Sequence, residues 1–194
     1  MYQNCKSLNE LWKYVYKLNE KFSKTLMPIL GNGKTYKPKV MFIFINPTAR
    51  NISSNPNWHG PRFPFIGTKQ IWNVFNKAGL FDNALMYKIN NVDWSIEFAN
   101  KVLKFLKNKS SYLTNVVKAT SYDAKLPNAK KINLFFPILE KEIELVKPKY
   151  IVTFGLIPYQ KLTKQKIKLK DYYNEVMKNK KLKFFDVKVN NIKT

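Results

Sequence analysis

The sequence predicts an α/β fold built around a mainly parallel sheet, and three observations indicate it. Residues 40–45 (VMFIFI) form a continuous apolar run rich in β-branched and aromatic residues, which is typical of a strand buried on both faces of a parallel sheet. Further strand-like runs alternate with segments of helical periodicity. The 194 residues suffice for one domain with a sizeable core, and they contain no repeat or linker, so we expect a single domain over residues 1–194.

Local signals place the individual elements. Gly79 is a good helix stop, Asp93 is expected to cap a helix, and Pro137 is expected to start or kink another. The predicted elements, in order, are helix 8–22, strand 40–45, helix 68–78, helix 94–107, strand 112–118, a helix ending near Val146, strand 150–154, helix 157–164 and a final β-hairpin with its turn near Asn190 and Asn191.

Asn46 and Pro47 directly follow the strand at 40–45. Proline fixes its own backbone and pushes the preceding residue toward extended geometry, so the Asn46 side chain is held where the strand ends. In open α/β sheets, ligands bind at the carboxyl ends of the strands. An Asn-Pro pair alone more often starts an ordinary turn. The residues that follow favour a binding site.

An aromatic segment without helical periodicity spans residues 51–67 and contains Trp58, His59, Phe63 and Phe65. One interpretation is that these rings cap the core. The other is a flat aromatic wall for a planar ligand such as a nucleobase, where stacking contributes about 1 to 3 kcal/mol per base. His59 is the only histidine and has no paired carboxylate, so a structural role or a DNA contact is favoured over catalysis.

Several segments carry a resemblance to a known family. INPTARNISS at 45–54, followed by FPFIGTKQIWNVFNKAGL at 63–80, resembles the first motif and the next helix of the uracil-DNA glycosylase superfamily, especially its mismatch-specific uracil/thymine branch. SYLTNVVKAT at 111–120 and PKYIVTFG at 148–155 resemble two later strands of the iron-sulfur uracil glycosylases. The resemblance implies a three-layer α/β/α sandwich with a central, mainly parallel sheet of about four strands.

The resemblance also implies roles for single residues. Asn46 would position the attacking water, Phe65 would stack on a base rotated out of the duplex, and Asn115 would recognise the pyrimidine edge. The implied pocket is completed by Ile45, Pro47 and Thr48. An Asn amide cannot act as a base near neutral pH, but its oxygen can orient a water, and the Asn115 amide offers both a donor and an acceptor. The implied reaction is hydrolytic removal of uracil or another deaminated or mismatched base, without metal or cofactor.

The composition agrees with a nucleic-acid partner. A formal charge of +23 implies a polyanion such as DNA. We assign DNA contacts to Arg50, Arg62, Lys69 and Lys118. The lysines are densest in the sequences KIKLKDYY and KNKKLKFFDVKV near the end of the chain, where a solvated rim and phosphate contacts fit equally well.

Two features depart from the family. The second motif of the superfamily, which supports the leaving base, is not found, and the final strand is expected to be missing. Phe44 stands where the mismatch-specific branch has glycine, so it either narrows the pocket or packs beneath it. A relative that binds nucleic acid with weak or no activity is therefore the first alternative. A nucleotide-binding enzyme of another α/β type is the second, and the lack of a Gly-rich phosphate loop argues against it.

The sequence disfavours membrane-spanning, secreted, disulfide-bonded and iron-sulfur proteins. The chain has no run of 18 apolar residues and no signal peptide, so we expect a cytoplasmic, monomeric protein. Cys5 is the single cysteine and can form neither an internal disulfide nor the four-cysteine cluster of the iron-sulfur glycosylases.

Overall fold

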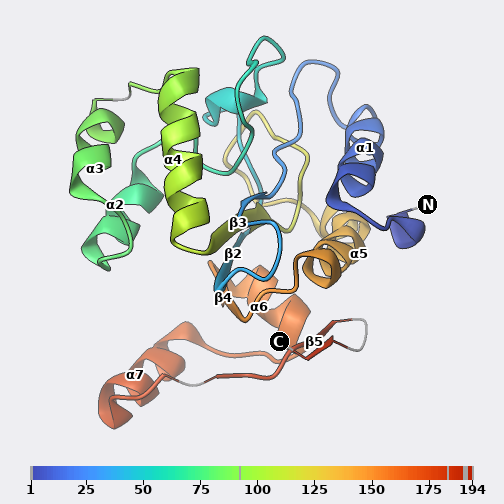
Figure 1. The fold of residues 1–194 in the computed structure, drawn as a ribbon. Coiled ribbons are helices and arrows are strands. Elements are labelled where there is room, and N and C mark those ends of the chain that lie inside the picture. Colours follow the sequence, from blue (N-terminus) through green and yellow to red (C-terminus); the bar gives the residue numbers. More distant parts are fainter. Residues whose placement is uncertain (1, 92, 183, 190–191, 194) are drawn as a thin grey trace.

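The main sheet lies at the centre of the molecule (Figure 1). The computed structural model describes residues 2–91, 93–182, 184–189 and 192–193. The sheet has four strands in the order β1-β3-β2-β4, with bounds Asn32–Gly33 for β1, Val40–Phe44 for β2, Ser111–Asn115 for β3 and Tyr150–Thr153 for β4. Strand β2 pairs in parallel with β3 and β4, whereas β1 is antiparallel to β3. The predicted, mainly parallel sheet of about four strands is confirmed.

The register of β2 and β3 decides which side chains share a face. Phe42 is aligned with Leu113, and Phe44 with Asn115. Because side chains alternate along a strand, these four residues face one side of the sheet and Ile43 faces the other. Asn115 thus ends a strand on the same face as Phe44.

Helices cover both faces of the sheet and complete the three-layer sandwich (Figure 1). One face is covered by α1 (Leu8–Asn19) and α5 (Ala129–Val146), and the other by α2 (Gln70–Lys77), α3 (Asn83–Asn90) and α4 (Ile96–Asn108). Ile43 packs in a core cluster with Leu11 of α1 and Leu139 of α5. Phe42 packs in the second cluster, with Trp72 and Phe98. The predicted α/β/α architecture is confirmed.

The segments after β4 lie below the sheet in Figure 1. They are α6 (Leu156–Thr163), α7 (Leu169–Asn179) and a two-stranded hairpin of β5 (Lys188–Val189) and β6 (Ile192–Lys193). The hairpin was predicted, and its turn at 190–191 lies outside the described residues. Short 3₁₀ turns occur at Tyr2–Asn4 and Ile52–Ser54. No described helix is long and apolar enough to span a membrane.

The cap of α4 differs from the prediction. The Ser95 side chain, not that of Asp93, accepts the hydrogen bond from the backbone N–H of Phe98, at 3.0 Å. Asp93 instead forms an exposed ion pair with Lys88, at 3.5 Å. A serine two residues later closes the open first turn equally well, so α4 begins at Ile96 rather than at residue 94.

Pro137 lies inside α5 and does not start it. The helix begins at Ala129, and the Asn128 side chain caps it by accepting from the Lys131 N–H at 2.8 Å. A proline in a helix interior removes one backbone hydrogen bond. Burial of an apolar face that includes Leu139 outweighs this cost. Of the two predicted alternatives for Pro137, a helix start is wrong.

Candidate functional site

Two neighbouring segments bring the predicted site residues to one edge of the sheet. Asn115 is the last residue of β3, and Asn46 follows β2 by two positions. The pairing continues past both strands, because the Ser121 N–H donates to the Pro47 carbonyl at 3.1 Å and Thr48 forms a parallel bridge with Ser121. The carboxyl ends of β2 and β3 therefore run on side by side into the two loops that carry the site.

The amide of Asn46 has a defined orientation. Its Nδ2 donates to the Ser121 hydroxyl at 3.2 Å. An amide nitrogen can only donate, so the Ser121 oxygen accepts from it, and the hydroxyl proton is shared between the carbonyls of Asp123, at 2.9 Å, and Pro47, at 3.3 Å. The Pro47 carbonyl is also a second, more distant acceptor for the Asn46 Nδ2, at 3.4 Å. The amide nitrogen thus faces Ser121, and the amide oxygen is directed elsewhere. A half-buried amide held in this way can bind a water through its oxygen but cannot deprotonate it.

Asn115 has an unpaired polar atom. Its side chain is 2% exposed, and its buried Nδ2 has no hydrogen-bond partner among the described residues. A buried donor without a partner costs about 1 to 3 kcal/mol, and such a group calls for an explanation. An acceptor on a bound ligand would satisfy it.

Phe65 is held in a strained backbone conformation. Its φ is +72°, which is rarely adopted by bulky residues and clusters at functional sites. The Phe65 carbonyl accepts from the Trp72 indole at 3.0 Å and from the Thr68 hydroxyl at 3.1 Å, and these bonds hold the conformation. The Phe65 ring meets the Phe44 ring edge-on with centroids 4.6 Å apart. Phe44, the residue in place of glycine, therefore packs against Phe65, and it is 4% exposed.

Arg62 serves the structure of the aromatic loop. Its guanidinium donates to the backbone carbonyls of Ser53, Asn55 and Trp58, the last at 2.9 Å. These three bonds use three of its five donors and tie together three carbonyls of one loop, and the DNA contact of the partly exposed Arg62 stays a prediction. Asn51 supports the same loop by donating to the Phe63 carbonyl at 2.9 Å.

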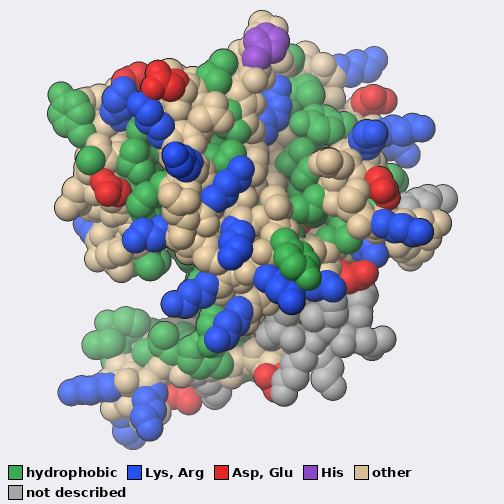
Figure 2. Space-filling model, in the orientation of Figure 1, with side chains coloured by type: hydrophobic (Ala, Val, Ile, Leu, Met, Phe, Trp, Pro, Cys, Tyr) green, Lys and Arg blue, Asp and Glu red, His purple; other side chains and the backbone are tan. Residues whose placement is uncertain are grey.

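The other predicted site residues differ in exposure. Arg50, Lys69 and His59 are exposed. Pro47 is buried, and Thr48 is half-buried. Figure 2 shows Lys and Arg side chains scattered over the visible face, with few acidic ones between them.

Ile45 lies against Gly155, at the junction of β4 and α6. A Cβ added to Gly155 would lie 3.1 Å from Ile45 Cδ1, and Gly155 also has a φ of +95°, which favours glycine. Ile45 thus packs at this junction, and any contact it makes with a substrate remains a prediction.

The structure corrects the predicted DNA contact of Lys118. Its side chain is fully buried and donates to Thr114 Oγ1, to the Asn115 carbonyl and to Glu142 Oε2, so it cannot reach a DNA phosphate. Glu142, on α5, also accepts from the Tyr112 hydroxyl at 2.8 Å. Burial lowers the pKa of Lys118 and the Glu142 carboxylate opposes that change, whereas burial raises the pKa of Tyr112 well above its ordinary value of 10.0.

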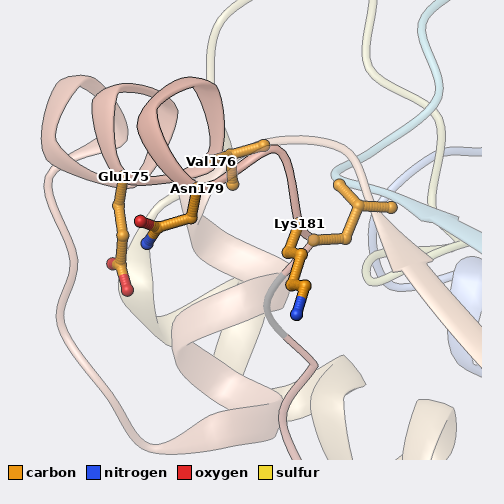
Figure 3. A pocket seen from close by; sticks show the side chains of 5 residues that line it. Glu175, Val176, Asn179 and Lys181 are labelled. Atoms are coloured by element: carbon orange, nitrogen blue, oxygen red, sulfur yellow. The ribbon is translucent and has the colours of Figure 1, made fainter.

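Two hollows in the C-terminal segment lie apart from these residues. One, of about 450 Å³, is lined by Glu175, Val176, Asn179, Lys181 and Leu182 beside α7 (Figure 3). The other is a groove of about 480 Å³ between β4 and the segments that follow it. Neither is lined by Asn46, Phe65 or Asn115.

The family comparison covers the whole candidate site. The sequence model of the uracil DNA glycosylase superfamily matches residues 30–188, from just before β1 to the start of β5. The chain belongs to this superfamily. A comparison with curated proteins gave no match. Membership of the uracil DNA glycosylase superfamily indicates a DNA glycosylase, a hydrolase that acts on DNA.

Sequence analysis missed three supporting groups of this glycosylase site. Ser121 orients Asn46 although 75 positions separate them in the chain, and no local pattern marks it. Trp72 is fully buried in the core, and its indole also holds Phe65. Glu142 is the partner of Lys118, and a fully buried carboxylate inside an amphipathic helix could have been noticed only from its place on the apolar face.

Proposed function

We propose that the protein is a monofunctional DNA glycosylase that removes uracil or another deaminated or mismatched base. The base is rotated out of the DNA and its N-glycosidic bond is hydrolysed, which releases the free base and leaves an abasic site. Asn46 orients the water, Phe65 stacks on the base, and Asn115 pairs with the base edge. The observation that carries this proposal is the buried, unpaired Nδ2 of Asn115 on the strand next to Asn46.

The side-chain amides of Asn46 and Asn115 suit the hydrolysis of an N-glycosidic bond. When the glycosidic bond is largely broken before attack, the water needs positioning more than deprotonation, and the Asn46 oxygen supplies that. The departing uracil carries negative charge spread over its ring nitrogen and oxygens. The Asn115 Nδ2 donates toward such an oxygen, and a donor aimed at developing charge lowers the barrier.

The branch within the superfamily, the monomeric state and the individual DNA contacts are proposed from the sequence. INPTARNISS supports a place in the mismatch-specific, Asn-Pro branch. We infer that residues 1–194 act as one monomeric domain inside the cell on uracil- or mismatch-containing DNA. Arg50 and Lys69 are exposed and remain the proposed DNA contacts.

The deciding experiment is base release from end-labelled oligonucleotides that carry uracil, a T·G mismatch or hypoxanthine, detected by alkaline cleavage. Asn46→Ala should release no base and still bind DNA. Asn57→Ala is the matched control, because it makes the same chemical change on an exposed part of the aromatic loop and should leave base release unchanged. Equal activity of Asn46→Ala and the parent protein would refute the mechanism.

A second candidate is a relative that binds nucleic acid without excising a base. It is favoured by the segments after β4, which form helices and a separate hairpin and add no strand to the main sheet within the described residues. The missing second motif points the same way, since losing one donor to a developing oxyanion costs about 10²- to 10³-fold in rate. This candidate predicts salt-sensitive DNA binding and no base release from any of the substrates.

A further inference from the structure

A fully buried ion pair lies behind Asn115. The side chains of Lys118 and Glu142 are both 0% exposed. Removing two charges from water is costly, and apolar residues of similar volume are often as stabilising as a buried pair. Stability alone is therefore a weak explanation for this pair, and its other contacts become informative.

The donors of Lys118 show what else it holds. An ammonium has three N–H donors, and those of Lys118 go to Thr114 Oγ1, the Asn115 carbonyl and Glu142 Oε2. On the β1 side of the sheet, strand pairing covers only Tyr112 and Leu113. The Asn115 carbonyl lies beyond that pairing, and the lysine supplies the donor that a neighbouring strand would otherwise provide.

The peptide unit after Asn115 is thereby held from both ends. Its oxygen accepts from Lys118, and its N–H, which belongs to Val116, donates to the Phe44 carbonyl at 2.8 Å. Two bonds in opposite directions fix the plane of this unit, because a peptide bond is rigid. The plane in turn sets the direction in which the Asn115 side chain leaves the backbone, and the unpaired Nδ2 depends on that direction.

We propose that Lys118, fixed by Glu142, is a positioning residue that sets Asn115 for base recognition. This inference rests on the proposed function and deepens it. Glu142 is itself fixed by the Tyr112 hydroxyl at 2.8 Å and by Thr114 Oγ1 at 2.9 Å, so α5 determines the geometry of a residue on β3.

The test replaces the pair without leaving a buried charge. Lys118→Met/Glu142→Gln removes both charges and keeps an acceptor for Tyr112. Its thermal unfolding should remain cooperative but occur at a lower temperature, because the buried Asn115 carbonyl loses its donor. The NMR signals of the Asn115 side-chain amide and the Val116 backbone amide should shift. The preference for uracil over cytosine in base release should fall by up to about tenfold, because the two bases differ on the edge that the Asn115 amide reads and one misdirected hydrogen bond has about that effect.

Lys101→Met/Glu97→Gln is the matched control. It makes the same two chemical changes in an exposed ion pair on α4, so it should keep both amide signals and the uracil preference. If the Lys118→Met/Glu142→Gln double variant does not fold, Lys118→Gln/Glu142→Gln replaces the ammonium with a shorter neutral donor. Shifts of the Asn115 side-chain and Val116 backbone amide signals in that variant then support the positioning role, and unchanged signals refute it.

Two results would overturn the inference. In the first, a folded double variant keeps the parent's Asn115 and Val116 signals and its uracil preference, which makes the ion pair merely structural. In the second, Lys101→Met/Glu97→Gln produces the same changes as the Lys118→Met/Glu142→Gln double variant, which makes them a general effect of losing an ion pair. If the proposed function itself is wrong, the parent protein releases no base. The amide signals of Asn115 and Val116 then still show whether Lys118 positions Asn115, so the two failures can be told apart.

Discussion

The side chains of the candidate site depend on neighbours from other segments. The closer acceptor of the Asn46 amide belongs to Ser121, and Trp72 helps to hold the strained backbone of Phe65. Asn46 and Phe65 could be named from the sequence because they lie in a contiguous motif. Their neighbours could not, since the contacts form only when the loop after β3 and helix α2 fold against the motif.

Removing the Ser121 hydroxyl should release the Asn46 amide. In Ser121→Ala the amide loses the closer of its two acceptors and keeps only the Pro47 carbonyl, so we expect single-turnover base release to slow about two- to tenfold, with DNA affinity unchanged. Ser121→Thr keeps a hydroxyl and should restore most of the rate. Parent-like base release by Ser121→Ala would show that Ser121 does not orient Asn46.

The buried phenol of Tyr112 should make stability fall at alkaline pH. Its pKa is raised well above 10.0 in the folded protein, so this stability is present below pH 10.0 and is lost as the pH rises above it. The lowered pKa of Lys118 acts in the opposite sense. In Tyr112→Phe the alkaline loss, measured by urea unfolding below and above pH 10.0, should be smaller than in the parent.

The control for this pH dependence is Tyr87→Phe, which removes a phenol that is 74% exposed. Its alkaline loss of stability should match that of the parent. A parent-like alkaline loss in Tyr112→Phe would mean that the buried phenol does not control the pH dependence.

Elements with a strong apolar pattern were predicted, and the others were not. Strands β2, β3 and β4, helices α1, α2, α4 and α6, the end of α5 and the hairpin of β5 and β6 were predicted, with bounds shifted by a few residues. Strand β1 has two residues, too few for any periodicity. Helix α7 buries no residue, so its sequence carries no core pattern, and α3 buries only Met86 and Ile89, too few to mark a period.

The cap of α4 gives a direct test at this scale. Ser95→Ala should lower the free energy of unfolding by about 1 kcal/mol, because the Phe98 N–H loses its acceptor. Asp93→Ala removes only an exposed ion pair with Lys88 and should cost less, about 0 to 1 kcal/mol. Urea unfolding of both variants measures the difference, and a larger cost for Asp93→Ala would assign the cap to Asp93 after all.

The whole molecule combines a large positive charge with buried charges that serve the fold. The formal charge of +23 supports a polyanionic partner, but the charge alone does not identify which lysines meet it. Lys118 illustrates the difference, since it lies inside the molecule, whereas Lys69 is exposed at the start of α2.

The affinity for DNA should fall steeply as the salt concentration rises. The slope of this fall should change when a lysine that contacts a phosphate is removed and stay the same when a distant lysine is removed. Lys69→Ala should reduce the slope of log affinity against log salt by about 0.9, the value expected for one phosphate contact. Lys109→Ala removes the same charge from an exposed residue before β3, at the opposite end of the strand from Asn115. It should leave the slope nearly unchanged in a binding titration on duplex DNA. Equal slopes for Lys69→Ala and the parent would place the DNA elsewhere.

The strand that leads into Asn46 and Pro47, the aromatic loop after it and the α/β class could all be predicted from the sequence. Local chemistry suffices for these, because a buried apolar strand followed by Asn-Pro fixes its own geometry. Only the tertiary structure decided that Lys118 points inward to Glu142 and that Ser121 meets Asn46. Those contacts join segments 24 and 75 positions apart, and their formation depends on helix packing and strand register rather than on any local pattern.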